Sequence, residues 1–237
     1  MNFTDLLDAF ASYTDKGEKI IRVKSTEDGL EAVEPGNVFI DNFDDDDLSW
    51  AWLTDETDAN RTITESGGVL TIAIANGTDG TWWTTANKAP KVITGVRGYP
   101  CEIITKINNT TIPADSSAGI FIAYDALGYG NSCYAFIRVD SDKISVGKNG
   151  TYWSQPAITG FPIWLRIRMT AGTGGTKGGR LIFGYSLDGE TFTDLYTGDA
   201  YNYAADTCGL FVRNWGAFPA VSVPFEFFKL TSSKGPG

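Results

Sequence analysis

Aromatic and arginine side chains alternate with apolar side chains along three short stretches of the sequence. In "SCYAFIRV" the apolar set includes Cys133 and Ile137, whereas the other set includes Tyr134 and Arg138. The corresponding second sets in "IWLRIRMT" and "CGLFVRNW" are Trp164, Arg166, Arg168, Phe211, Arg213 and Trp215. A period of two is typical of a β-strand with one face toward a core. We therefore expect the aromatic and arginine residues to lie on the face that points away from the core.

Such a face could bind a glycan if the three strands share one sheet. Flat rings stack on sugars, and arginine donates paired hydrogen bonds to hydroxyls or carboxylates. The same residue types also occur at protein–protein interfaces and in ordinary surface stacking, so these two alternatives stay open. Trp153, in the turn-rich stretch "GTYWSQ", is a further candidate because loops commonly carry recognition. The candidate glycan-binding residues are Tyr134, Arg138, Trp153, Trp164, Arg166, Arg168, Arg213 and Trp215.

An acidic run, "DNFDDDD", offers a second kind of chemistry. Asp41, Asp44 and Asp45 carry the hard oxygen ligands that calcium prefers. The run does not fit the twelve-residue calcium loop with its central glycine and terminal glutamate. A solvated acidic turn that helps solubility is the alternative interpretation.

The composition restricts catalytic chemistry and the range of partners. The chain has 237 residues, no histidine and a formal net charge of −10. Without histidine there is no Ser-His-Asp or Cys-His arrangement, and the negative charge disfavours nucleic acid and anionic membranes. No stretch approaches the roughly 20 apolar residues that span a bilayer. Cys101, Cys133 and Cys208 lie in apolar runs, which predicts small buried thiols rather than a disulfide or a metal site.

Two short elements precede the main body. One apolar stripe at helical spacing predicts a helix of about three turns, and its residues are Phe3, Leu6, Leu7 and Phe10. "EKIIRVK" and "LEAVE", joined by a turn at Asp28-Gly29, predict a β-hairpin that contains Ile21 and Val23. Both elements are marginal alone, so they form either an attachment or oligomerisation segment or simply pack on the body.

From Val38 onward the chain reads as short strands separated by turn residues. The stretches with the clearest strand pattern are "GVLTIAIA", "CEIITKI", "AGIFIAY", "SCYAFIRV", "KISVG", "WLRIRMT", "RLIFGYS", "CGLFVRNW" and "VPFEFFKL". This organisation predicts an all-β sandwich or jelly roll. We expect an N-terminal segment over residues 1–36, a sandwich over 37–232 and a loose tail over 233–237.

Several pieces of the body resemble the concanavalin A-like lectin/glucanase superfamily, in particular the sandwich modules found behind β-xylosidases. The resemblance rests on the Ala118-Gly119-Ile120 and Leu165-Arg166-Ile167 strands and on the hairpin "YSLDGETF". It implies a concanavalin A-like jelly roll and a possible structural calcium near the first and last strands, within reach of Glu226. Hydrolytic members of this superfamily carry a Glu-x-Asp-x-x-Glu strand. The sequence has no such strand, which indicates a protein that is not an enzyme.

The stretch "GEKIIRVKSTEDGLEAVEPG" resembles a short β-motif of tailed-bacteriophage fibre and virion proteins. The start "MNFTDLLDAFASYT" does not read as a signal peptide. Together these features imply a virion protein, a head decoration or fibre component assembled in the bacterial cytoplasm. We expect it to contact other virion proteins through residues 1–36, to form a homo-oligomer and to bind host-surface glycans. The alternative is a bacterial carbohydrate-binding protein or an accessory module of a glycoside hydrolase.

Overall fold

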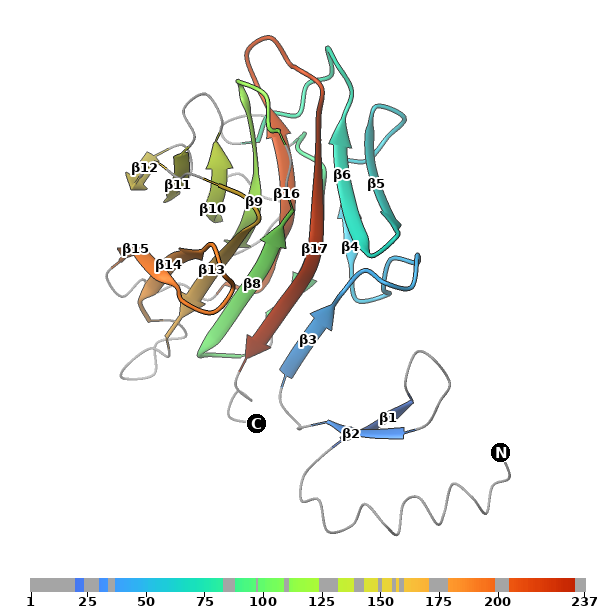
Figure 1. Ribbon diagram of the computed structural model, residues 1–237, viewed down its shortest axis with the longest axis vertical. Coiled ribbons are helices and arrows are strands. Elements are labelled where there is room, and N and C mark those ends of the chain that lie inside the picture. Colours follow the sequence, from blue (N-terminus) through green and yellow to red (C-terminus); the bar gives the residue numbers. More distant parts are fainter. Residues whose placement is uncertain are drawn as a thin grey trace. The chain divides into compact units, whose positions relative to one another are not determined.

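Figure 1 shows the computed structural model of the chain. It describes residues 20–23, 30–33, 37–82, 88–96, 98–108, 111–123, 132–138, 143–148, 151–154, 157, 160–170, 179–198 and 205–232. For 20–23, 30–33, 37, 132–138, 148 and 151–154 it describes the backbone without the side chains. The chain divides into two compact units, Met1–Asn37 and Val38–Gly237.

The first unit contains a two-stranded antiparallel sheet. β1 (Ile20–Val23) pairs with β2 (Leu30–Val33), and Ile20 lies opposite Val33. The hairpin predicted from the alternating pattern is therefore confirmed. Ile21 and Val23 lie on β1, and their side chains lie outside the described residues. The predicted helix, with Phe3, Leu6, Leu7 and Phe10, lies outside the described residues as well.

The second unit is built from two antiparallel sheets. The strands of the seven-stranded sheet are, in spatial order, β12 (Thr151–Ser154), β11 (Lys143–Lys148), β10 (Ser132–Arg138), β9 (Ser116–Ala123), β16 (Thr207–Asn214), β7 (Lys91–Gly95) and β4 (Leu53–Asp55). Those of the eight-stranded sheet are β15 (Thr193–Thr197), β14 (Leu181–Ser186), β13 (Ile163–Met169), β8 (Cys101–Ile107), β17 (Val221–Ser232), β6 (Val69–Ile74) and β5 (Arg61–Ser66), with β3 (Asn37–Asp41) also paired to β17. The described residues form strands and turns and no helix. The predicted all-β sandwich is confirmed.

The main hydrophobic core lies between the two sheets. In β8 and β13 every second residue is fully buried, for example Ile103, Leu165 and Ile167, and the residues between them are half-buried. The seven-stranded sheet contributes Ile120 and Leu210 from its two central strands. We call the face of each sheet that points away from this core its outer face. Burial of the alternating apolar side chains is the main force that holds the two sheets together.

The segment between β3 and β4 passes from the eight-stranded sheet to the seven-stranded sheet and contributes two aromatic side chains to the core. Phe43 is buried, and Trp52 packs edge-on against Phe39 and Phe228, with ring centroids 5.2 and 4.7 Å apart. The Trp52 indole Nε1–H donates a hydrogen bond to Asp41 Oδ2 at 2.8 Å. The first aspartate of the acidic run is thus part of the fold, because it satisfies the one polar atom of a buried indole.

The cysteine prediction holds for two of the three residues. Cys101 and Cys208 are buried free thiols, and burial raises the pKa of Cys101 to about 12. The side chain of Cys133 lies outside the described residues. The part of the chain that the structure describes contains no helix able to cross a membrane.

Candidate binding face of the seven-stranded sheet

The three strands with the alternating pattern do not share one sheet, so the condition for a single aromatic and arginine face is not met. Arg213 lies on β16 and Arg138 on β10, both in the seven-stranded sheet, whereas Arg166 lies on β13 in the eight-stranded sheet. Trp164 and Arg168 accompany Arg166 on β13. The outer faces of two packed sheets point in opposite directions, so the eight candidate residues divide into two separate groups.

On the eight-stranded sheet the candidates are engaged in packing. Asp194 accepts a hydrogen bond from Arg166 at 3.0 Å and another from Arg168 at 2.8 Å. The Arg166 guanidinium also lies over the Phe192 ring, 4.1 Å from its centroid.

The Trp164 ring on the same strand is covered by its neighbours. The Lys106 ammonium lies 5.1 Å from the ring centroid, and Gly189 is so close that a Cβ there would meet Trp164 Cε2 at 2.8 Å. This indole is therefore a poor platform for stacking a sugar.

The outer face of the seven-stranded sheet holds a second aromatic cluster. Trp82 stands edge-on to Phe121 and Phe211, with centroids 5.0 Å from each. All three rings are buried. The outward position of Phe211 predicts an exposed ring, whereas the structure shows a buried one. The alternating pattern predicts on which face of the sheet Phe211 lies. It cannot show that Trp82, from a distant segment of the chain, packs over that face.

Two buried cations share this face with the aromatic cluster. The Lys91 ammonium forms an ion pair with Asp55 at 2.5 Å and lies 5.1 Å from the Trp82 ring centroid. Burial lowers the pKa of Lys91, and the neighbouring Asp55 carboxylate opposes that shift. Arg213, two residues from Phe211, is the second buried cation. An acidic protein thus holds two cations on one sheet face.

Arg213 and Trp215 form the most promising recognition group on this face. The Arg213 guanidinium lies 4.7 Å from the Trp215 ring centroid, and its Nε–H donates to Ser117 Oγ at 2.6 Å. Trp215 is half-buried and follows β16 in a tight turn, where its N–H donates to the Asp115 carbonyl at 2.9 Å. The Trp215 ring is the accessible part of this arrangement and can stack on a sugar, whereas the buried guanidinium and hydroxyl beside it fix the orientation of the ring.

Asn214 fixes the loops at this end of the sheet. Its side-chain oxygen accepts from the Gly80 N–H at 2.8 Å, and its amide donates to the Thr78 and Pro219 carbonyls at 3.1 and 2.9 Å. Asn214 is buried, and it lies between Arg213 and Trp215 in the sequence. It therefore couples the two loops beside the Arg213–Trp215 pair to β16.

The strand register brings another candidate to the same part of the sheet. Arg138 pairs with Ser117 across β10 and β9, and Ser117 pairs with Arg213 across β9 and β16. Tyr134 lies opposite Phe121 in the same ladder. The side chains of Tyr134 and Arg138, and that of Trp153 on β12, lie outside the described residues.

The predicted calcium residues do not come together as a site. Glu226, on β17, pairs with Lys106 instead of facing the acidic run. Asp41 holds the Trp52 indole and the Phe43 N–H, and Asp45 accepts from the Asp47 N–H at 3.4 Å. Among the described residues no group of three or more Cys, Asp or Glu is arranged to hold a metal ion. Asp44 is exposed, which suits the alternative interpretation of this run as a solvated acidic turn.

A half-buried carboxyl group that the sequence did not single out lies near the acidic run. Glu65 is at an inward position of β5, and both of its carboxyl oxygens are buried. Burial and the neighbouring carboxylates of Asp45 and Asp41 raise the pKa of Glu65 to about 8. The available signal was an acidic residue at an apolar position of the alternating stretch "RTITES".

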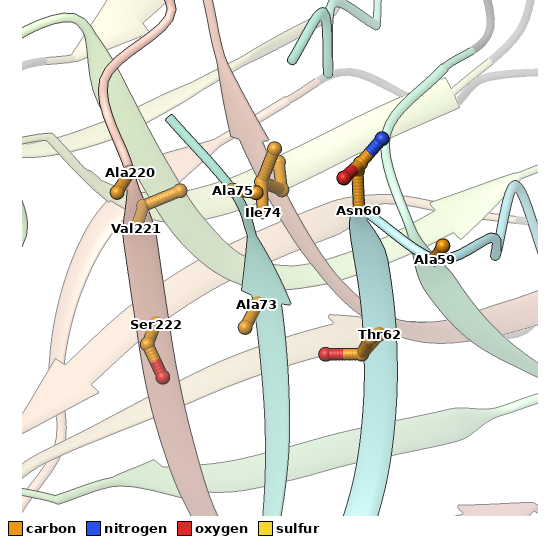
Figure 2. Close-up of a pocket in the computed structure, with 9 residues that line it drawn as sticks. All are labelled: Ala59, Asn60, Thr62, Ala73, Ile74, Ala75, Ala220, Val221 and Ser222. Carbon is orange, nitrogen blue, oxygen red and sulfur yellow. The ribbon is translucent and has the colours of Figure 1, made fainter. Parts of the chain in front are cut away.

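A shallow pocket of about 340 Å³ lies at the end of β5, β6 and β17. Thr62, Ala73 and Ser222 are register partners across these strands, and the two hydroxyls lie on either side of Ala73 in Figure 2. The remaining lining residues are Ala59, Asn60, Ile74, Ala75, Ala220 and Val221. The lining contains neither an aromatic ring nor a charged group, so it lacks the features that make the Arg213–Trp215 pair a recognition group.

The structure is similar in fold to several solved structures. The GH43 protein BlXynB from Bacillus licheniformis superposes with a TM-score of 0.69 at 16% identity, over 90% of this chain and 46% of that chain. The exoplasmic/lumenal domain of VIP36, in its Ca²⁺/Man2-bound form, superposes with a TM-score of 0.54 at 11% identity. The match covers 84% of this chain and 89% of that chain. A functionally unknown protein from Saccharomyces cerevisiae superposes with a TM-score of 0.56 at 18% identity, over 78% of this chain and 98% of that chain.

These similarities show the fold, a concanavalin-like β-sandwich. The chain spans less than half of the length of the GH43 structures that it matches first. No protein-family model and no curated protein sequence matches the chain.

Proposed function

We propose that the second unit is a carbohydrate-binding β-sandwich without catalytic activity. The observation that carries this proposal is the Arg213–Trp215 stack with its Ser117 hydrogen bond, at the end of the outer face of the seven-stranded sheet. The half-buried Trp215 ring offers a flat apolar face on which a sugar can stack, and the buried Arg213 guanidinium holds that ring in place. The lack of histidine and of the paired-glutamate strand supports binding over hydrolysis.

The structural neighbours indicate which ligands to try first. They include GH43 proteins, a xylan β-1,4-xylosidase from Bacillus halodurans and a mannose-disaccharide-bound VIP36 domain. Xylan and mannobiose are therefore suitable probes. The neutral probes also avoid repulsion by the net charge of −10.

The test compares one substitution on each sheet. Trp215→Ala should weaken binding of the best probe about 5-fold, because a stacking contact is worth roughly 1 kcal/mol. Arg213→Lys should also weaken it, since lysine lacks the Nε–H that bonds Ser117 and the planar group that holds the Trp215 ring. Trp164→Ala is the matched control on the opposite face and should leave affinity unchanged, with circular dichroism confirming that each variant folds. Calorimetry that finds no binding of any probe, or a loss confined to Trp164→Ala, would refute the proposal.

We further propose that residues 1–36 attach the sandwich to a larger assembly, a bacteriophage particle as the virion-type motif implies. Two observations favour attachment: Met1–Asn37 forms its own compact unit, and β1 pairs within that unit with β2. A chain that begins at residue 37 should keep polysaccharide binding and fail to co-sediment with particles. Incorporation of this truncated chain would contradict the attachment role while leaving the carbohydrate proposal intact.

A further inference from the structure

Asp115 is the partner of Trp215 at the end of a strand ladder. The register of β9 and β16 ends with Ser116 opposite Asn214, so the next two residues that face each other are Asp115 and Trp215. The Trp215 N–H donates to the Asp115 carbonyl at 2.9 Å and extends the ladder by one step. Asp115 therefore lies next to the residue whose ring forms the proposed sugar site.

The turn around Trp215 is shaped to hold the side chain of Asp115. The φ of Asp115 is +59°, a region that residues other than glycine, asparagine and aspartate rarely occupy. Gly216 follows Trp215 with a φ of +64°. A Cβ at Gly216 would meet the Asp115 Oδ2 at 2.5 Å. The carboxylate of Asp115 thus packs against the backbone of the residue that follows Trp215, where any other side chain would displace it.

The Asp115 carboxylate is available to a ligand. The residue is half-buried, and within the part of the chain that the structure describes no hydrogen bond or ion pair uses its side chain. An ionised carboxylate accepts several hydrogen bonds and donates none. A sugar offers hydroxyl donors at the edge of a flat apolar face, which matches a carboxylate beside an aromatic ring.

We propose that Asp115 determines the specificity of the Trp215 site, where its carboxylate accepts hydrogen bonds from the hydroxyls of a neutral sugar. This inference rests on the carbohydrate-binding function proposed above. The ring stacks on the apolar face of the sugar, and the carboxylate selects hydroxyl donors at its edge. An acidic sugar would bring a second negative charge to Asp115, and like charges that meet at an interface weaken binding strongly. The site therefore takes neutral sugars and rejects uronic acids and sulfated sugars.

The cation next to the ring does not reverse this preference. Arg213 is 1% exposed, and its guanidinium lies against the Trp215 ring while its Nε–H donates to Ser117. A carboxylate on a bound sugar cannot reach this guanidinium, whereas Asp115 is half-buried and reachable from solvent. The net charge of −10 acts in the same direction as Asp115, because it repels anionic ligands at longer range.

Two substitutions at Asp115 test the carboxylate by calorimetry, with xylobiose and mannobiose as the neutral probes. Asp115→Gly removes the side chain and keeps the backbone relaxed, because glycine adopts a positive φ without strain. It should weaken binding of the better neutral probe about 10-fold, the loss expected for a hydrogen bond to a charged group. Asp115→Asn keeps one acceptor oxygen and tolerates the same φ, so it should weaken that binding less. Urea melts confirm that both variants fold.

Acidic counterparts of the two probes test the charge preference. Diglucuronate carries the ring hydroxyls of xylobiose, and dimannuronate carries those of mannobiose. Wild-type protein should bind the neutral sugar at least about 10-fold more tightly than its counterpart, and Asp115→Asn should reduce this preference about 3-fold. Asp46→Asn is the matched control, because Asp46 is exposed with a φ of +58° and its substitution removes the same charge from the acidic run. It should leave both affinities unchanged.

The outcomes separate this inference from the carbohydrate proposal. Binding that requires Trp215 and is unchanged in Asp115→Gly would overturn the inference and leave the proposed function intact. Wild-type protein that binds the acidic sugar as tightly as the neutral one would do the same. An equal loss of preference in Asp46→Asn would also overturn it, since the net charge and not Asp115 would then select the ligand. Wild-type protein that binds neither neutral probe, or binds without any need for Trp215, would overturn both.

Discussion

Replacing Glu65 by glutamine should change how stability depends on pH. The pKa of Glu65 in the folded protein is raised from 4.5 to about 8, with burial as the largest cause and Asp45 and Asp41 as the others. Between these two pH values the unfolded chain has lost this proton and the folded chain retains it. Because the folded state binds more protons, its stability falls as pH rises from about 4.5 to about 8 and then levels off.

The structure limits the size of this effect. Each pKa unit corresponds to about 1.36 kcal/mol, so a shift to about 8 sets a ceiling of roughly 5 kcal/mol. Solvent reaches the half-buried side chain and screens the interaction, which reduces the expected contribution to about 1–2 kcal/mol. Glu65→Gln should be more stable than the wild type by that amount at pH 8 to 9, and the difference should vanish below pH 4.5.

Urea denaturation of both proteins at several pH values between 4 and 9 measures the difference curve. Subtracting the two curves removes the titration of every group that the proteins share. Asp45→Asn should reduce the wild-type slope, since it removes a neighbouring carboxylate whose negative charge favours protonated Glu65. A flat difference curve, or a Glu65→Gln variant that is less stable at pH 8, would refute this reasoning.

Four further outcomes follow from other contacts. Gly189→Ala should lower the free energy of unfolding by about 1–3 kcal/mol in urea melts, because φ is +80° and the new Cβ would meet Trp164 at 2.8 Å. Asp55→Asn should cost about 3 kcal/mol in the same assay, since it removes the carboxylate partner of the buried Lys91 ammonium; an unchanged midpoint would contradict the ion pair. Cys101 should react with a thiol reagent only after denaturant is added, because its thiol is buried and its pKa is about 12. Adding calcium and then EDTA should leave the melting temperature unchanged, and a reversible rise with calcium would instead establish a metal site.

Most strands with a buried face could be predicted from the sequence, with the inner strand β7 as an exception, and the edge strands β5 and β15 could not. "CEIITKI" and "WLRIRMT" alternate clearly, and they form β8 and β13. β5 and β15 were missed because "RTITES" and "TDLYT" are polar and largely exposed, so little burial constrains their side chains. An edge strand is held by backbone pairing with its neighbour, and that pairing is not visible in residue types.

The sequence by itself determined which side chains of each strand point away from the core, because the pleat alternates with a period of two. It therefore predicted the outward positions of Arg166 and Arg213 correctly. Only the tertiary structure decided that β13 and β16 belong to different sheets, which separates these two arginines. It also decided that Trp82 packs over the face that carries Phe211. The reason is that strand pairing and loop packing join residues far apart in the chain, and no local pattern records which of them meet.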